Sequence, residues 1–406
     1  MPTVITKTIK PDGTGDYLTL QAWITAQGAD LPVLDQIRRA VCYSGGNLCS
    51  GGELLFLPGW GVKSDATRYY DIVAAPGHEH PGYWDTGKAY FQAAAGYAIR
   101  SYDNVVHLTG MQFKSNTNIC LYAPPGAASY IADMCLLNGI QGLGTDTGAQ
   151  VHRLTHSQIV VGTGGLALYC RGNGVTMDVY DCTIIAPSGQ GMAAYLGSVF
   201  TSENCYWKAA LCYQTSGGGA VVNKGANDAT STAEATNPAL RNIPFSTATF
   251  VSVTGDLDLH LAVGSALIDT GADLSAIVGS YDFEGAVRPQ GAAWDIGAAE
   301  APPAWKSCSG AATGPAPTAA GGASRGTYCV GAATGAAPVV VCAADNPVCA
   351  GILFGPSPTA HGHAHGSGER FSGRLFTHDG LDMVWSRGSP ETRFSRAIPD
   401  RIFTVQ

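Results

Sequence analysis

A six-residue pattern of apolar and polar positions recurs five times in the middle of the chain. Its first, fourth and sixth positions are apolar or small, and the fourth and sixth keep the two-residue alternation of a β-strand. The segments begin 23, 23, 25 and 23 residues apart, at 108–113, 131–136, 154–159, 179–184 and, more weakly, 202–207. A nearly constant period of this length predicts a solenoid, because one repeat buries its apolar face only by stacking on the next.

The third position of each segment holds a residue type that tolerates a left-handed backbone, so a bend between two short strands is expected there. A helical repeat is the alternative, but the segments are rich in Gly, Thr, Val, Tyr and Asn and lack apolar spacing of three and four. The sequence therefore predicts an all-β, right-handed parallel β-helix with three short strands per coil. The bend positions are Gly110, Asp133, His156, Asp181 and Asn204, and the fourth-position core column is Met111, Met134, Ser157, Cys182 and Cys205.

The two ends of the solenoid differ in their patterns. Leu20, Trp23 and Ile24 have the spacing of one helical face, so a helix of about two turns is expected to cap the first coil. We expect a cap and first coils over residues 1–100, and the β-helix with a closing segment over 101–300.

A second, shorter repeat follows in a region of Ala, Gly and Pro. The pattern C-x-G-x-x-x-G-x-x-P begins at Cys308, Cys329 and Cys349, in steps of 21 and 20 residues. Glycine, proline and cysteine in register predict a small repeated β-module over 301–366 rather than a linker. Ordinary alternation returns over 367–406 and predicts an antiparallel β tip.

The composition of the chain limits which classes of partner are expected. A formal net charge of −8 argues against nucleic-acid binding, and charged residues make up only 13% of the 406 residues, which is typical of proteins that live in assemblies. No apolar stretch of about 18 residues is present, so no membrane span is expected, and the first residues lack the apolar core of a signal peptide. We expect most of the 12 cysteines to be buried thiols, with Cys42/Cys49 and Cys205/Cys212 as disulfide candidates.

Motifs outside the hexads resemble those of right-handed, pectate-lyase-like β-helix proteins of tailed bacteriophages. They are the segments 11–23 (PDGTGDYLTLQAW), 77–85 (GHEHPGYWD), 282–289 (DFEGAVRP) and 294–300 (WDIGAAE). The resemblance covers roughly residues 5–300. It implies a virion-surface protein such as a head decoration, head fibre or tail spike, often a homotrimer bound to capsid or tail proteins. Bacterial surface proteins have similar closing motifs, which leaves an adhesin as a third class.

The pectate-lyase label raises the question of catalysis. A lyase acting on acidic glycans needs a carboxylate cluster for a hard cation and a base, and the hexads show none. Asp133, His156 and Asp181 are the best catalytic candidates, since stacked bends would place the carboxylates about 10 Å apart, as in inverting glycosidases. The competing interpretation is that Asp, His and Asn fill these bends because they accept the backbone geometry.

Two further groups could bind ligands. His361, His363 and His365 alternate, so on a strand they would point the same way and could hold a transition metal where chains meet; a Gly/His connecting loop is the alternative. Similar alternating histidines occur at some phage fibre tips. His78 and His80 fit a turn better than a ligand pair. Five aromatic residues could form a glycan-binding stripe or fill space between strands: Tyr122, Tyr169, Tyr195, Tyr213 and Trp207.

The resemblance, together with the solenoid pattern, favours a non-enzymatic structural protein of a phage particle, with host surface glycans as a candidate partner. A tail-spike hydrolase or lyase degrading host capsule or lipopolysaccharide is the alternative.

Overall fold

The structure is a computed structural model that describes residues 1–301, except 50–51, 57–62, 103, 127, 147, 149 and 256. Beyond residue 301 it describes only the backbone of ten strands. The chain forms two compact units, Met1–Ala301 and Pro302–Gln406.

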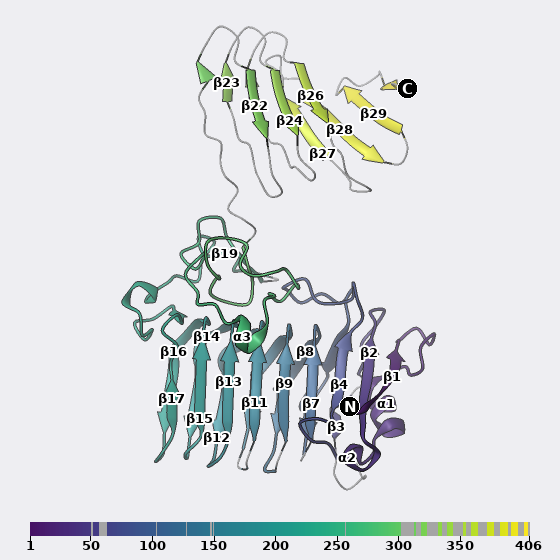
Figure 1. The fold of residues 1–406 in the computed structure, drawn as a ribbon, viewed down its shortest axis with the longest axis vertical. Helices are drawn as coiled ribbons and strands as arrows, with labels where there is room; N and C mark the ends of the chain where they lie inside the picture. The colour runs from purple at the N-terminus through teal and green to yellow at the C-terminus, as the bar shows by residue number, and fades with distance from the viewer. Residues whose placement is uncertain are drawn as a thin grey trace. The chain divides into compact units, whose positions relative to one another are not determined.

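Two nine-stranded parallel sheets, here called sheet I and sheet II, build the first unit, and from Val105 onward the chain alternates between them (Figure 1). Sheet I consists of β1 Thr3–Ile9, β2 Gln36–Cys42, β4 Tyr70–Ala74, β7 Val105–Thr109, β9 Ser129–Asp133, β11 Val151–Thr155, β13 Thr176–Tyr180, β15 Val199–Glu203 and β17 Val221–Asn223. Sheet II consists of β3 Leu54–Phe56, β5 Tyr90–Ala93, β6 Ile99–Ser101, β8 Gln112–Ala123, β10 Leu136–Thr145, β12 Gln158–Arg171, β14 Thr183–Tyr195, β16 Tyr206–Ser216 and β18 Ala229–Thr230.

The long strands of sheet II change register in their middles, which divides each of them into two segments. The shift falls between Gly139 and Gln141 in β10 and between Val160 and Leu166 in β12. Each such coil thus contributes one strand to sheet I and two segments to sheet II. This is the parallel β-solenoid that the sequence predicted, with two of the three expected short strands joined into one irregular strand of sheet II.

The core columns follow the prediction with one correction. Residues with positive φ occupy the same bend of successive coils: Gly110, Met134, His156, Asp181 and Asn204. Strand pairing aligns Leu108 with Ala132 and Ala132 with Leu154, so the second hexad begins at Ala132 rather than Ile131. Met134 therefore takes the bend expected for Asp133, and Cys135 takes the buried position expected for Met134.

The register error has a physical cause. The run from Ile131 to Leu137 satisfies the apolar pattern in both registers, and propensity favours Asp over Met at a left-handed bend. Strand pairing and the burial of Cys135 outweigh that preference. The column beside the bend is then Met111, Cys135, Ser157, Cys182 and Cys205, all of them buried.

The cap is a helix, as predicted. Helix α1 spans Leu20–Gln27, and the Thr19 hydroxyl accepts the first capping hydrogen bond from the Ala22 N–H at 3.1 Å. Leu20, Trp23 and Ile24 are buried in the main core. A one-turn helix, α2 Leu31–Leu34, leads into β2.

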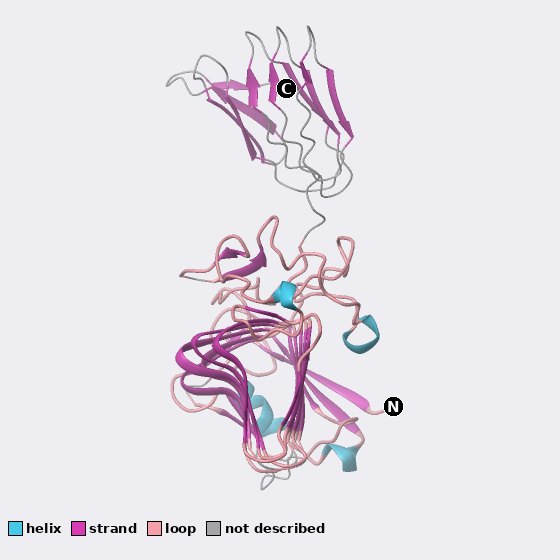
Figure 2. Cartoon of the chain, turned by 90° about the vertical axis from the view of Figure 1, so that its left-hand side faces the viewer, coloured by secondary structure: helices cyan, strands magenta, loops and turns pink. Residues whose placement is uncertain are grey.

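A closing segment, residues 231–301, folds back against the outer side of sheet II (Figure 2). It contains a 3-10 turn at Pro238–Leu240, the antiparallel pair β19 Phe250–Ser252 and β20 Asp258–Leu261, and α3 Ser275–Val278. Its apolar residues form a second core with Ile185 and Tyr206, which point outward from sheet II. One half of that sheet is therefore covered by the chain itself.

The second unit pairs its strands at the step of the short repeat. Two three-stranded parallel sheets are formed by β21 Ala312–Thr313, β23 Ala332–Thr334 and β25 Ile352–Phe354, and by β22 Thr318–Gly322, β24 Val339–Ala343 and β26 Thr359–His363. An antiparallel sheet follows, with β27 Ser372–Phe376, β28 Asp382–Gly388, β29 Glu391–Arg396 and β30 Ile402–Thr404. In the described part of the chain, no helix has the length and apolar character needed to cross a membrane.

Candidate functional site

The three catalytic candidates lie together although Asp133 does not occupy the bend. His156 lies between the two carboxylates, with Nδ1 2.8 Å from Asp133 Oδ1 and Nε2 3.7 Å from Asp181 Oδ2. The side chain of Asp133 is 33% exposed, whereas those of His156 and Asp181 are 1% and 0% exposed. Only one end of this row reaches solvent.

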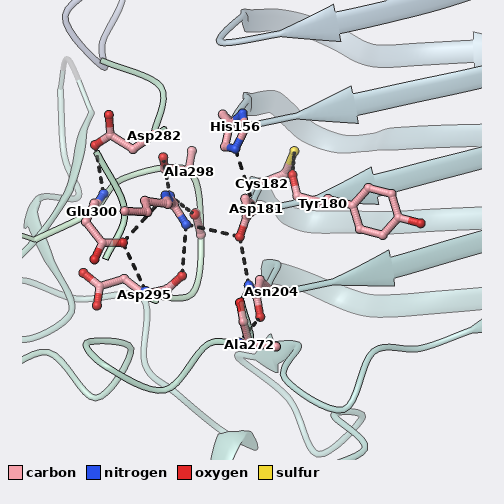
Figure 3. A network of polar contacts seen from close by, with 12 residues as sticks. His156, Tyr180, Asp181, Cys182, Asn204, Ala272, Asp282, Asp295, Ala298 and Glu300 are labelled. Atoms are coloured by element: carbon pink, nitrogen blue, oxygen red, sulfur yellow. Dashed lines mark hydrogen bonds and ion pairs between the residues drawn. The ribbon is translucent and has the colours of Figure 1, made fainter. Parts of the chain in front are cut away.

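Arg288 from the closing segment covers the other end. Figure 3 shows Asp181 between His156 and Asn204. Its Nη1 donates to Asp181 Oδ1 at 3.1 Å, and its Nη2 donates to the carbonyl oxygens of Gly297 and Ala298, both at 2.8 Å. Its Nε lies 3.6 Å from Glu300 Oε2, and the Arg288 side chain is fully buried. The guanidinium therefore joins two buried carboxylates and the backbone turn 295–298.

Asn204 fixes the neighbouring bend to the same segment. Its side-chain N–H donates to Asp181 Oδ1 at 3.0 Å and to the Ala272 carbonyl at 2.8 Å, and its amide oxygen accepts from the Ala272 N–H at 2.8 Å. Two bends of the solenoid, at Asp181 and Asn204, thus contact the closing segment through polar groups. We call His156, Asp181, Asn204, Arg288 and Glu300 the bend network.

Burial dominates the acidity of this network. It raises the pKa of Asp181 to about 6, although Arg288, His156 and Asn204 act in the opposite direction. Burial likewise raises the pKa of Glu300 to about 7. Perturbed carboxyl groups occur in active sites and in structural ion networks alike. Because Asp181 and Arg288 are fully buried, the geometry here is that of a structural joint between solenoid and closing segment.

The segment 77–85 packs against the closing segment as a turn. His80 is buried, stacks on Phe283 at 5.7 Å, and its Nε2 lies 2.9 Å from the Met134 carbonyl oxygen. Burial lowers the pKa of His80 to about 4. His260 also contacts the Phe283 ring, and it lies between the carboxylates of Asp258 and Glu284. Burial opposes the positive charge of His260, but its hydrogen bonds to these carboxylates raise its pKa to about 9.

The metal prediction at His361, His363 and His365 falls on side chains outside the described residues. Within the described part of the chain, no group of three His, Cys, Asp or Glu side chains could hold a metal ion. Neither disulfide candidate forms: Cys42, Cys205 and Cys212 are buried thiols.

The aromatic residues divide into two groups. Trp207 and Tyr213 belong to the core, and the Tyr213 hydroxyl donates to the buried Asp228 carboxylate at 2.8 Å. In contrast, Tyr122, Tyr169 and Tyr195 are half-buried on the outer side of sheet II. Tyr122 and Tyr169 share one column, each aligned with Gly144 between them.

Two more tyrosines and two arginines complete this surface. Tyr97 stacks on Tyr122 at 4.4 Å, and Arg100 lies over the rings of Tyr97 and Tyr102 at 5.4 and 5.7 Å. Arg171 is exposed, aligns with Tyr195, and forms a hydrogen bond with Tyr169 that raises the pKa of Arg171. We call these seven residues the tyrosine face: Tyr97, Arg100, Tyr102, Tyr122, Tyr169, Arg171 and Tyr195.

Sequence reasoning missed four members of the tyrosine face. Tyr97, Arg100 and Tyr102 precede the first hexad, where the repeat gives no register. Arg171 follows Tyr169 by two residues, so strand alternation places both on the same side. That alternation was the available signal.

A shallow hollow of about 390 Å³ lies on three neighbouring strands of sheet II, β12, β14 and β16. Leu166, Gln190 and Leu211 are aligned across it, and glycines form its rim. A Cβ at Gly189 would come within 1.7 Å of the Gly165 carbonyl oxygen, so this close coil stacking requires glycine. The hollow offers the side chains of Ser188 and Gln190 as hydrogen-bonding groups.

Comparisons with known proteins give no family assignment. No protein-family model matches the chain, and no match is found among curated proteins or solved structures.

Proposed function

We propose that this chain is a non-enzymatic structural component of a bacteriophage particle that contacts host surface glycans through the tyrosine face. The observation that carries the proposal is the tyrosine face itself. Five partly exposed tyrosines and two arginines lie on the solenoid surface, separate from the closed bend network.

The chemistry of this face fits sugars. Tyrosine rings present apolar area with a polar hydroxyl and lose little conformational entropy on binding. The stacked pair Tyr97/Tyr122 and the tilted pair Tyr169/Tyr195, at 5.5 Å, hold their rings in place before a ligand arrives. Tyr122, Tyr169 and Tyr195 lie on strands of the solenoid, which position rings more accurately than loops do.

The virion assignment is supported by where the phage-like motifs lie. The segment 11–23 leads into and includes the start of the α1 cap, 77–85 packs against the closing segment, and 282–300 supplies Arg288 and Glu300. A rigid solenoid joined in this way suits a mechanical role at the virion surface. Self-association, with a trimer as the expected state, and attachment to capsid or tail proteins belong to the same proposal.

A tail-spike hydrolase or lyase remains the second candidate because of one contact. The His156 imidazole is hydrogen-bonded to Asp133, whose carboxylate is partly exposed. The non-enzymatic proposal is supported by Asp181, which inverting chemistry would need and which instead lies fully buried beside Arg288.

The test has two parts: whether the protein is present on phage particles, and whether it cleaves host polysaccharide. Antibodies against the chain should label purified phage particles, and labelling that is absent from particles would contradict the virion assignment. Incubation with host capsule or lipopolysaccharide should release no reducing ends above a no-protein control. Sustained release that disappears in Asp133→Asn would replace the structural proposal by the enzymatic one.

A further inference from the structure

The outer face of sheet I carries an apolar ladder that no described segment covers. Strand pairing aligns Val105 with Ser129, Val151 with Thr176, and Val199 with both Thr176 and Val221. The Val151 N–H donates to the Ser129 hydroxyl at 3.2 Å, which joins the two halves of the row. Val4 and Ile37 form the corresponding pair at the N-terminal end of the sheet.

Several members of this ladder are well exposed. The exposed fractions of Val4, Val151 and Val221 are 45%, 54% and 45%. Scattered exposed valines are common, but these valines lie in one row that is interrupted only by the small polar residues Ser129 and Thr176. Exposed apolar patches on a protein surface mark interaction sites. On sheet II the comparable outward residues Ile185 and Tyr206 are covered by the closing segment.

The neighbouring outward column carries charges that are paired within the chain. Arg39 Nε lies 2.6 Å from Asp71 Oδ2, and Arg153 Nη2 lies 3.9 Å from Asp178 Oδ2. Between these pairs, His107 stacks on Tyr69 at 3.6 Å, and burial lowers the pKa of His107 to about 4, so it is neutral. This column thus contributes no net charge that would repel another copy of the chain.

The dimensions fit a protein partner. Nine strands about 4.8 Å apart, most of them five residues long at about 3.3 Å per residue, give a flat area of about 600 Å². A stable interface buries about 800 Å² of accessible surface on each partner, and side-chain relief brings this face close to that value. A polyanionic partner would find no unpaired cation among Arg39 and Arg153.

We propose that the outer face of sheet I is the self-association surface, on which a second copy of this chain docks. The inference deepens the self-association part of the proposed function by naming its surface. It does not depend on glycan binding, because the tyrosine face lies on sheet II.

The experiment measures the mass of the full-length chain by light scattering and sedimentation velocity. Val151→Lys combined with Val199→Lys should shift a defined oligomer to monomer or weaken association at least about tenfold. Ile140→Lys is the matched control, because Ile140 is a 46% exposed apolar residue on sheet II, and it should keep the wild-type mass. A monomeric wild type, or a double variant with the wild-type mass, overturns the proposal.

A second measurement uses only the wild type, so it tests the proposal even if the double variant misfolds. Hydrogen exchange of the wild-type peptides that contain β11 and β15 should slow as protein concentration rises, whereas peptides of the β16 segment should not change. Exchange in β11 and β15 that is independent of concentration overturns the proposal whatever the variant does. Glycan binding by the wild type is a separate readout, so failure of either proposal can be recognised alone.

Discussion

Replacing Arg288 by Met tests the bend network most severely. The change removes the guanidinium that lies 3.1 Å from Asp181 Oδ1, and leaves the Gly297 and Ala298 carbonyl oxygens without their 2.8 Å donor. Removing one partner of a buried ion pair typically costs about 3–5 kcal/mol. At about 2 °C or more per kcal/mol for a unit of this size, the melting temperature should fall by roughly 6–10 °C.

The loss should depend on pH in a defined direction. Burial already raises the pKa of Asp181 to about 6 and of Glu300 to about 7, and loss of the guanidinium raises both further. A carboxyl group whose pKa is raised by folding destabilises the fold as pH increases through the interval between its unfolded and folded pKa. The melting difference between wild type and Arg288→Met should therefore be larger at pH 8 than at pH 5.

Differential scanning fluorimetry and limited proteolysis measure this effect. The closing segment, residues 231–301, should become the first cleavage region in the variant. Arg241→Met is the control, because Arg241 lies on the same segment but is exposed, and its side chain donates to the backbone carbonyls of Ala235 and Thr236 rather than to a buried carboxylate. A variant that melts with the wild type, or a difference that is the same at both pH values, would refute the reasoning.

Three further predictions concern other parts of the solenoid. Gly189→Ala should lower stability by more than about 3 kcal/mol, because its Cβ would overlap the Gly165 carbonyl oxygen, whereas Gly162→Ala, which meets open space, should be nearly neutral in chemical denaturation. The His260 contribution to stability should be full below about pH 6.5 and disappear as pH rises through about 9, so melting curves of wild type and His260→Gln should converge at alkaline pH. Burial raises the pKa of Cys120 and Cys135 to about 12, so a thiol reagent should label them only when the unit unfolds; rapid native labelling would show that the core columns are open.

The stacked architecture could be predicted from the sequence because a solenoid repeats one local solution. Four of the five hexads have the predicted register, and the N-terminal cap follows from the spacing of Leu20, Trp23 and Ile24. The register of the second coil could not be predicted from the sequence, because Ile131 and Ala132 start equally good apolar patterns. Pairing with β7 and β11 decides between them, and pairing is not a local property.

The environment of the candidate residues was harder to predict than their proximity. Spacing alone brought Asp133, His156 and Asp181 onto neighbouring coils. Their burial depends on Arg288, which lies 107 residues beyond Asp181 in the chain and follows no period. In the same way, Trp207 and Tyr213 differ from Tyr122 only in which side of a bent strand they occupy, and the bend is set by coil-to-coil stacking.

The decisive measurement is a binding titration with purified host capsule or lipopolysaccharide. It compares the wild type with the double variant Tyr122→Ala/Tyr169→Ala. The account predicts saturable binding by the wild type, a loss of at least about tenfold in affinity for the double variant, and unchanged polysaccharide chain length at the end of the titration. Equal affinity of the two proteins for the polysaccharide, or progressive shortening of its chains, would contradict it.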